Sequence, residues 1–397
     1  MIKRPIINNE QIGKQGDIIV DTYKVNSYRD TWIEVDVNAI ADNVKAVKTL
    51  HHPDVHVMAV VKADGYGHGA ITVARTAIES GAEWVGVALL EEALELREAG
   101  IDVPILILGP IHPQDASVAQ RYRIAVTAFQ QEWLAEAGSY LDPDPPLHVH
   151  LKCDTGMGRI GLTDEQTLLN MIKLLKQDKR FEMTGIFTHL ATADEWGSDY
   201  LSRQLKAFQS FVLLAKEAAG HIPYVHYSNS AASLRYPGND YNMIRFGISM
   251  YGLVPAVETA SDIPVPLKPA MSLHSRLTHV KKVQPATFIS YGATYQANEE
   301  EWIGTVPIGY GDGWLRANAT NGGEVLVEGK RCPIVGRICM DQMMIRLPEK
   351  APVGTKVTLI GKQEREEISI EEVSERLSTI TYEIPCTLNA RIPRVYK

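Results

Sequence analysis

Eight short runs of β-branched and other apolar residues recur along the first two thirds of the chain. They are VMAVVK from Val57, WVGVAL from Trp84, PILILG from Pro104, RIAVTA from Arg123, LHVHLK from Leu147, MTGIFTH from Met183, YVHYSN from Tyr224 and MIRFGIS from Met243. Most of the gaps hold helix-compatible sequence, such as ITVARTAIESG and LEEALELREAG, with a glycine where the helix would stop. Apolar strands alternating with helices indicate a parallel sheet covered on both faces. Eight such units favour a (β/α)8 barrel of the TIM type over an open, doubly wound sheet.

The pattern changes near Pro269 to short strands separated by glycine-containing turns, with one helix-like piece at SIEEVSERL. Pro264, Pro266 and Pro269 interrupt any regular element just before this change. We therefore predict three parts: an N-terminal extension (1–30), a barrel (31–265) and a mostly antiparallel, β-rich C-terminal domain (266–397).

Charge and composition exclude several classes of partner. The formal net charge of -8 argues against nucleic acid and anionic membranes, which select clustered Lys and Arg. No apolar run approaches the roughly 18 residues of a membrane helix, and the first thirty residues lack the apolar core of a signal peptide. The four cysteines form no CxxC pair, which fits a reducing compartment. We expect a cytoplasmic protein that acts on a small molecule.

Chemically active residues stand where these predicted strands end, which in a parallel barrel is the catalytic face. Lys62 ends the first run, Lys152 and Asp154 follow the fifth, and His189 follows the sixth. Residues 228–230 end the seventh strand and residues 246–249 the eighth, and small residues and exposed amides at these places are where such barrels commonly hold a phosphate. A lone lysine there is most simply a snorkelling side chain. A lysine beside a phosphate site can instead form a Schiff base with pyridoxal 5'-phosphate (PLP), an electron sink for carbanions at an amino-acid α carbon.

An ordered series of motifs resembles one known family. AVVKADGYGHG resembles the PLP-attachment signature of alanine racemases, and HLKCDTGMGRIG, THLATADE, SNSAAS, MIRFGISMYGL, SYGATY, IGYGDGW and GRICMDQ resemble further motifs of that family in the same order. The resemblance covers essentially residues 31–397. It implies a PLP-dependent isomerase that interconverts L-alanine and D-alanine, a cell-wall precursor.

The resemblance also implies roles for individual residues. Lys62 would bind the cofactor and act as the base on one face of the α carbon, and Tyr291 would be the base on the opposite face, because racemisation needs a proton donor on each side. A free tyrosine has a pKa near 10, so a relay through His189 and Arg245 would stabilise the phenolate. Arg245 would also face the pyridine nitrogen, and since a guanidinium only donates hydrogen bonds, that nitrogen would stay uncharged.

Further positions would complete the site. Arg159 would orient the cofactor and the substrate carboxylate, and Lys152 would be carbamylated so that its added negative charge holds Arg159. The remaining residues would contact the phosphate (Tyr66, Ser230, Gly247, Ile248 and Tyr382), narrow the mouth (Tyr310 and Tyr382) or contact the substrate carboxylate (Met340). His68, in the glycine-rich turn, is more simply a structural residue. A narrow mouth favours alanine, yet one excess methylene costs only about 1–3 kcal/mol, so serine is expected to react slowly.

The family resemblance places Tyr291, in the second domain, at the site of a partner subunit. We therefore expect a homodimer with two shared sites.

The sequence leaves three other functions open. One is a metal-dependent hydrolase that would use His148, His150, carbamylated Lys152, His189 and His226, although such enzymes carry the HxH pair on the first strand. The others are a PLP-carrying binding protein, which would lack the second domain, and a PLP-dependent decarboxylase with a longer substrate.

Overall fold

The barrel predicted from the apolar runs is present in the computed structural model, which describes residues 28–197, 199–238 and 241–397. Its parallel strands, in sheet order, are β8 (Tyr224–His226), β7 (Phe181–Phe187), β6 (Leu147–Lys152), β5 (Ile124–Ala128), β4 (Ile105–Ile107), β3 (Trp84–Val87), β2 (His56–Val60) and β9 (Met243–Phe246). Between β8 and β9 the ring closes through single backbone bonds, from Arg245 N to Ser228 O (3.0 Å) and from Asn242 N to Val225 O (3.3 Å).

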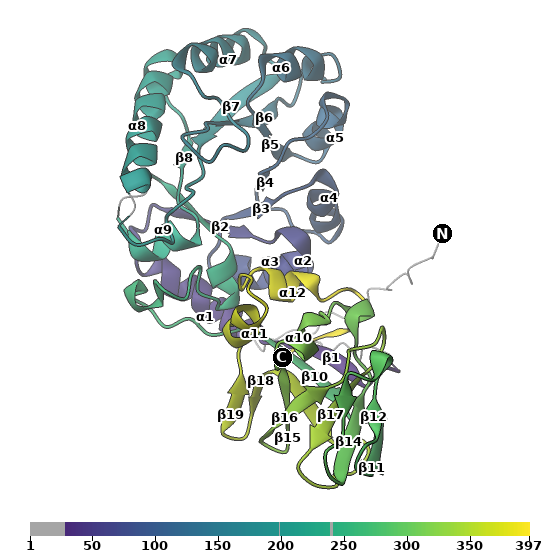
Figure 1. The fold of residues 1–397 in the computed structure, drawn as a ribbon. Helices are drawn as coiled ribbons and strands as arrows, with labels where there is room; N and C mark the ends of the chain where they lie inside the picture. Colours follow the sequence, from purple (N-terminus) through teal and green to yellow (C-terminus); the bar gives the residue numbers. More distant parts are fainter. Residues whose placement is uncertain (1–27, 198, 239–240) are drawn as a thin grey trace, which may run out of the picture.

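Helices cover the outside of this ring, as Figure 1 shows. They are α1 (Val37–Lys48), α3 (Ala70–Glu79), α4 (Leu90–Glu98), α5 (Ala116–Arg121), α6 (Gln131–Gly138), α7 (Glu165–Gln177), α8 (Asp199–Ala219) and α9 (Ser230–Arg235). Alternate residues of each strand face these helices, and the others fill the barrel. Met58, Trp84, Leu106, Ala125 and Met243 form a separate apolar cluster inside it. The core is therefore packed, and the active face is left to the strand ends.

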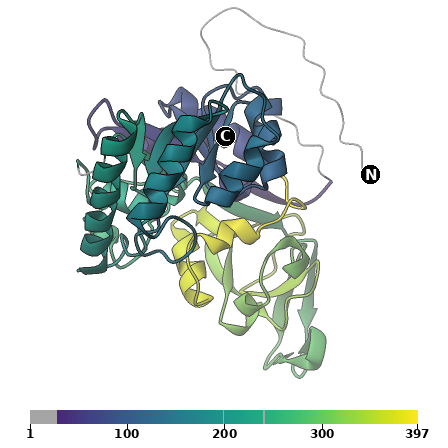
Figure 2. The same ribbon diagram turned by 90° about the horizontal axis from the view of Figure 1, so that it is seen from above.

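The second domain is a mostly antiparallel sheet that lies beside the barrel (Figure 2). Its main sheet follows the order β11 (His279–Val283), β14 (Glu301–Val306), β17 (Met343–Leu347), β16 (Lys330–Val335), β15 (Glu324–Val327), β18 (Lys356–Gln363), β10 (Met271–Arg276), β1 (Thr31–Val35) and β20 (Arg394–Tyr396), with β19 (Glu366–Ile368) on β18. A hairpin joins β12 (Phe288–Ile289) to β13 (Tyr295–Gln296), and the helices are α10 (Ala317–Thr320), α11 (Ile370–Arg376) and α12 (Glu383–Thr387). The predicted helical piece at SIEEVSERL is α11.

The placement of β1 corrects the predicted start of the barrel. We assigned residues from 31 onward to the barrel, but β1 pairs with β10 and β20 of the second domain's sheet. Thr31, Ile33 and Val35 are buried, and the residues between them are half-exposed. This alternation is typical of a strand with one face on a core, whereas barrel strands such as β3, β4 and β5 are buried at every position. The other predicted boundary, at residues 265 and 266, stays a prediction.

The N-terminal extension was expected to be of uncertain order, and residues 1–27 lie outside the described part of the chain. Arg29, within the predicted extension, makes a defined contact. Its guanidinium donates both to Asp312 Oδ1 and to Asp312 Oδ2, at 2.6 Å each, and to the carbonyl of Pro307. Asp312 is fully buried, so this ion pair fixes Arg29 to the turn that carries Tyr310.

Replacing Arg29 with alanine is expected to lower the free energy of unfolding by about 2 kcal/mol, because the buried Asp312 carboxylate loses a bidentate partner. The loss is moderated since Arg391 lies 3.4 Å from the same carboxylate. Denaturant unfolding of the two proteins measures it. Lys268→Ala, which removes an exposed ion pair with Asp42, is the matched control and is expected to change stability little. Equal stabilities for Arg29→Ala and this control would contradict the expectation.

Two further sequence expectations bear on location. Among the described residues, none of the helices combines the length and apolar character that a bilayer span requires. All four cysteines, which lie within the described ranges, are unpaired.

Candidate active site

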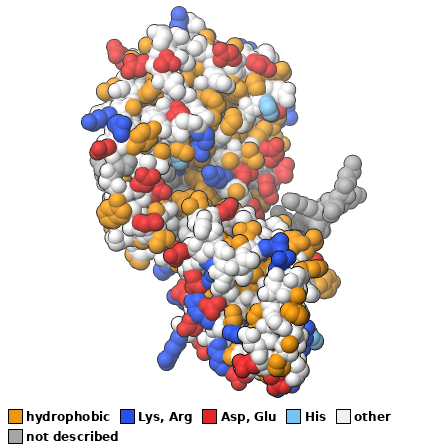
Figure 3. Space-filling view, viewed as in Figure 1, with side chains coloured by type: hydrophobic (Ala, Val, Ile, Leu, Met, Phe, Trp, Pro, Cys, Tyr) orange, Lys and Arg blue, Asp and Glu red, His pale blue; other side chains and the backbone are white. Residues whose placement is uncertain are grey.

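A cavity of about 180 Å³ opens at the carboxyl ends of the barrel strands. Four cationic side chains line it and no carboxylate does: Lys62, Lys152, Arg159 and Arg245. The other lining residues are Val60, Tyr66, Leu108, Phe187, His189, Asn229, Ser230, Gly247, Ile248 and Tyr382. Figure 3 shows Lys and Arg side chains gathered in a hollow on the barrel face. Such a cavity is suited to a ligand with more than one negative charge.

Lys62 enters the cavity because the chain turns sharply after β2. In α2 (Lys62–Tyr66), residues Ala63, Asp64 and Gly65 have φ of 52°, 53° and 61°, a left-handed stretch that costs energy for residues other than glycine. Hydrogen bonds hold it: Ala63 N donates to Glu92 Oε1 (2.6 Å) and Ala70 N donates to Asp64 Oδ1 (3.0 Å). Burial, and then the charge of Arg159, lower the pKa of the Lys62 amine. More of this amine is therefore neutral and able to act as a nucleophile or base.

Lys152 is the last residue of β6, and Arg159 lies in the loop that follows; both line the cavity. Burial lowers the pKa of Lys152 to about 7, with further contributions from Arg245 and Arg159. Its Nζ lies 4.6 Å from the centre of the Phe187 ring. Asp154, noted in the sequence beside Lys152, organises the loop that carries Arg159, because its Oδ1 accepts from the amides of Gly156 (2.9 Å) and Gly158 (3.0 Å).

Arg245, on β9, is the centre of a buried hydrogen-bond network. Its Nη1 lies 2.9 Å from Nδ1 of His226, and its Nη2 lies 3.3 Å from Nδ1 of His189. The same Nη2 donates to the carbonyls of Thr188 (2.9 Å) and Tyr227 (2.8 Å). Burial, and then the charge of Arg245, lower the pKa of His189 and of His226 well below the ordinary value. Both imidazoles are neutral at working pH. His226 accepts a hydrogen bond from Nη1 at its Nδ1, and His189 Nδ1, at 3.3 Å, shares an Nη2 proton with one of the two carbonyls.

Two residues after Arg245, hydroxyl groups form a cradle around Gly247 in the wall of the same cavity. Ser230 Oγ accepts from the amide of Gly247 at 2.9 Å. A Cβ atom added to Gly247 would lie 3.0 Å from Tyr66 Oη and 3.7 Å from Ser230 Oγ. Both hydroxyls therefore face the space that glycine leaves free. Burial raises the pKa of the Tyr66 phenol, so it remains a hydrogen-bond donor.

The structure thus brings nine predicted cofactor contacts and Lys152 to one cavity, while three predicted substrate residues lie elsewhere. Tyr291, Tyr310 and Met340 belong to the second domain and are 70%, 41% and 53% exposed. None of the three lines the cavity of the same chain. Exposed aromatic and apolar side chains gathered on one domain are typical of a surface that another chain covers.

Sequence reasoning missed the role of His226. It entered only as a ligand of the rival metal site, although it contacts Arg245 directly. Its one signal in the sequence is its place in the seventh apolar run.

The geometry around His226 argues against the metal site of the alternative hydrolase. A guanidinium occupies the space beside His226, and a divalent cation there would be repelled. Among the described residues no group of three or more His, Cys, Asp or Glu gathers to hold a metal.

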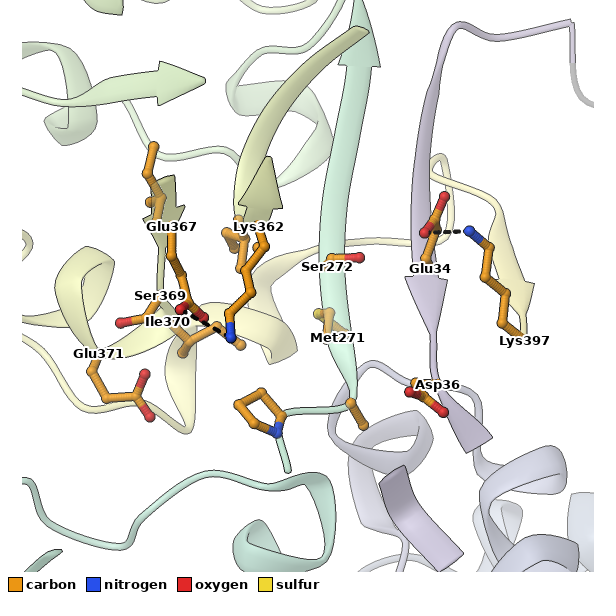
Figure 4. Close-up of a pocket in the computed structure, with 15 residues that line it drawn as sticks. Glu34, Asp36, Met271, Ser272, Lys362, Glu367, Ser369, Ile370, Glu371 and Lys397 are labelled. Atoms are coloured by element: carbon orange, nitrogen blue, oxygen red, sulfur yellow. Dashed lines mark ion pairs between the residues drawn. The ribbon is translucent and has the colours of Figure 1, made fainter. Parts of the chain in front are cut away.

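A larger cavity, of about 320 Å³, lies where β1, β10, β18 and α11 meet (Figure 4). Its charged side chains largely pair with one another. Lys397 Nζ lies 2.6 Å from Glu34 Oε2, and Lys362 Nζ lies 3.5 Å from Glu367 Oε2. Both lining lysines are thus paired, and the carboxylates of Asp36 and Glu371 lie outside these two pairs, so the barrel cavity is the better candidate for an anionic ligand.

Family models match both parts of the chain. The model described as alanine racemase, N-terminal domain, matches residues 35–255, and the model described as alanine racemase, C-terminal domain, matches residues 270–396. Among characterised relatives, the alanine racemase of Geobacillus stearothermophilus is 54% identical over 93% of this chain and 94% of its own length. Alanine racemase 1 of Bacillus subtilis is 46% identical over 93% of each chain.

Solved structures show the same similarity. The alanine racemase of Bacillus anthracis with bound L-Ala-P superposes with a TM-score of 0.91 at 48% identity and covers 94% of this chain and 96% of its own. A histidine racemase from Leuconostoc mesenteroides superposes with a TM-score of 0.85 at 30% identity and covers 93% and 98%. The same architecture therefore occurs in racemases named for amino acids with different side chains.

Proposed function

The chain belongs to the alanine racemase family, and from that premise we propose that it interconverts L-alanine and D-alanine with PLP bound in the barrel cavity. One observation carries the proposal: the amine of Lys62 shares a carboxylate-free cavity with the guanidinium of Arg245 and the cradle around Gly247. An amine, a donor-only guanidinium and a cradle of hydroxyl and amide groups suit the aldehyde, the ring nitrogen and the phosphate of that cofactor.

The residues fit the cofactor as follows. Lys62 would carry its aldehyde end, Arg245 would face its ring nitrogen, and the phosphate contacts would be Tyr66, Ser230, Gly247, Ile248 and Tyr382. When bound, PLP supplies an electron sink for the negative charge that develops at the substrate α carbon. Because a guanidinium donates hydrogen bonds and does not give up a proton near neutral pH, Arg245 would leave the ring nitrogen uncharged and make the cofactor a weaker electron sink. Prompt reprotonation of the α carbon, the step that completes racemisation, would then be favoured.

Two bases on opposite faces would move the proton. Lys62 would take or return it on one face, and its lowered pKa supports this role. Tyr291 of the partner subunit would act on the other face, and its 70% exposure in the single chain supports a site completed by a second copy. The homodimer would also bring Tyr310 and Met340 to the mouth, where they would restrict the substrate to a small side chain.

His189 would support the phenolate of Tyr291. Its Nδ1 lies toward Arg245, so the neutral ring carries its proton on Nε2 and can donate it. A donor placed at the phenolic oxygen stabilises the charged form and lowers the phenol's pKa. Arg159 would bind the substrate carboxylate. A cytoplasmic location, and use of D-alanine in the cell wall, are part of this proposal.

Lys152 is expected to carry a carbamate. Its neutral amine would attack CO2, forming an N–C bond and releasing one proton, and the resulting anion would offset Arg159 and Arg245. Since the pKa of Lys152 is about 7, carbamate should increase as the pH rises through 7 and decrease below it, where the amine is protonated. Labelling with 13C-bicarbonate and 13C NMR measures it, and Lys152→Met is the control that should lack the signal. A signal of equal intensity in both proteins would contradict the assignment.

The direct test is to incubate the cofactor-loaded protein with L-alanine in heavy water. Optical rotation and exchange of the α proton are followed together. Loss of rotation accompanied by exchange is expected, because each turnover removes the α proton and replaces it from groups that exchange with solvent. Release of CO2 or ammonia instead would redirect the proposal toward a decarboxylase or another PLP reaction.

A further inference from the structure

A second buried histidine lies behind the Arg245 network, on the inside of the barrel. His150, on β6, is fully buried, and its Nδ1 lies 3.0 Å from Nε2 of His226. Trp84, Tyr224 and Phe187 surround it, with ring centroids 5.5, 6.0 and 6.5 Å away. Barrel interiors are normally filled by branched apolar residues, so an imidazole at this depth needs a reason.

The direction of every hydrogen bond in this series follows from Arg245. A guanidinium can only donate, so this contact is a hydrogen bond only in the tautomer in which His226 accepts at Nδ1. A neutral imidazole that accepts at Nδ1 carries its proton on Nε2, and this proton points at His150 Nδ1. His150 must therefore accept at Nδ1 and carry its own proton on Nε2. Any other arrangement sets two protons or two lone pairs against each other.

His150 is held in this orientation at a cost to stability. A Cβ atom on Gly185 would lie 2.5 Å from His150 Nδ1 and 2.7 Å from its Cγ, so the ring packs directly on the backbone of β7. Its interplanar angle with Tyr224 is only 16°. Nε2 of His150 is buried and has no hydrogen-bond partner among the described residues. An apolar side chain would avoid that penalty, so stability alone does not account for an imidazole here.

We propose that His150 is a positioning residue: by accepting a hydrogen bond from His226 Nε2–H, it stabilises the tautomer in which His226 holds Arg245 where the cofactor ring would bind. The inference rests on the proposed function, since it concerns the residue that would face the cofactor ring. If His150 could not accept, the tautomer with its proton on Nε2 would bury an unsatisfied N–H, and its advantage over the tautomer with the proton on Nδ1 would shrink. In that second tautomer the proton is directed at the guanidinium, and Arg245 would lose one of its anchors.

The electrostatic surroundings keep both rings neutral. Burial lowers the pKa of His150 to about 3, with the charges of His148 and Arg245 adding to the effect. Burial, Arg245, His150 and Lys152 act in the same direction on His226. Over the working range of pH, the directions of the hydrogen bonds between Arg245, His226 and His150 therefore depend on which tautomer each neutral ring adopts, and not on a change in their charge.

The test is two-bond 15N–1H correlation NMR of the holoenzyme labelled with [15N]histidine, which reports which ring nitrogen carries the proton. In the wild type we expect His226 and His150 both to be protonated on Nε2 only. A proton on Nδ1 of either ring would overturn the inference without any variant being needed.

Variants connect this pattern to catalysis. His150→Leu removes the acceptor, and His150→Asn keeps an oxygen near the position of Nδ1. We expect His150→Leu to mix the tautomers of His226 and to lower kcat about 10-fold, with KM little changed. His150→Asn should retain the His226 tautomer and most of kcat. His148→Asn is the matched control on the same strand, with an exposed side chain paired to Glu182.

An unchanged His226 signal in His150→Leu would overturn the inference even if activity fell, because the loss would then be structural. Failure of the proposed function would give a different result in the exchange experiment. In that case the wild type would show no α-proton exchange with L-alanine, whatever its tautomers are.

Discussion

Replacing Lys62 with alanine is expected to lower kcat/KM for alanine racemisation by about 10³-fold or more, because one substitution removes both the attachment point of the cofactor and the base on one face. Lys62 is the cavity lysine that follows β2 directly, and burial has already lowered its pKa toward the working range. Racemisation is measured by circular dichroism from both enantiomers, and the cofactor's absorbance reports whether it is still bound.

The control is Lys173→Ala, which removes an exposed lysine from α7 and should leave activity unchanged. A small primary amine added to Lys62→Ala should restore part of the rate, since it can replace the missing base. In the wild type, borohydride reduction and peptide mapping should find the modification on Lys62. Activity of Lys62→Ala within 10-fold of the wild type would contradict the assignment.

Mixing Lys62→Ala with Tyr291→Phe is expected to restore activity that neither variant has alone. If each site combines Lys62 of one chain with Tyr291 of the other, a mixed dimer contains one intact site and one doubly defective site. Random exchange makes about half of the dimers mixed, so about a quarter of the wild-type sites should return. Activity is measured after unfolding and refolding the two chains together, with mass spectrometry to count mixed dimers.

The sharpest control mixes Lys62→Ala with Arg245→Ala. Both residues line the cavity of a single chain, so no mixed dimer has an intact site and activity should stay absent. Equal recovery in both mixtures would show that the gain comes from refolding and not from shared sites. No recovery in the first mixture, with mixed dimers detected, would show that Tyr291 does not act across subunits.

The fold was largely predictable because its signals are local. All eight barrel strands coincide with the apolar runs, and α11 lies in the predicted helical piece. β1 was misassigned for a physical reason. A strand's own sequence reports how many of its faces are buried, but not which sheet supplies its partners. Only the pairing of β1 with β10 and β20 decided its domain.

The sequence by itself determined which residues stand at the strand ends, since an apolar run followed by a turn places its last residues at the barrel mouth. Lys62, Lys152 and His189 were found in this way, and the series of motifs that identifies the family was found separately, by its resemblance to alanine racemases. Only the tertiary structure decided what surrounds them: the contact of His226 with Arg245 and His150, the clamp of Arg29 on Asp312, and the exposure of Tyr291. Hydrogen bonding, burial and the pKa of a side chain depend on neighbours that are far apart in the chain. The spacing of residues in the sequence does not show which of these distant residues come into contact.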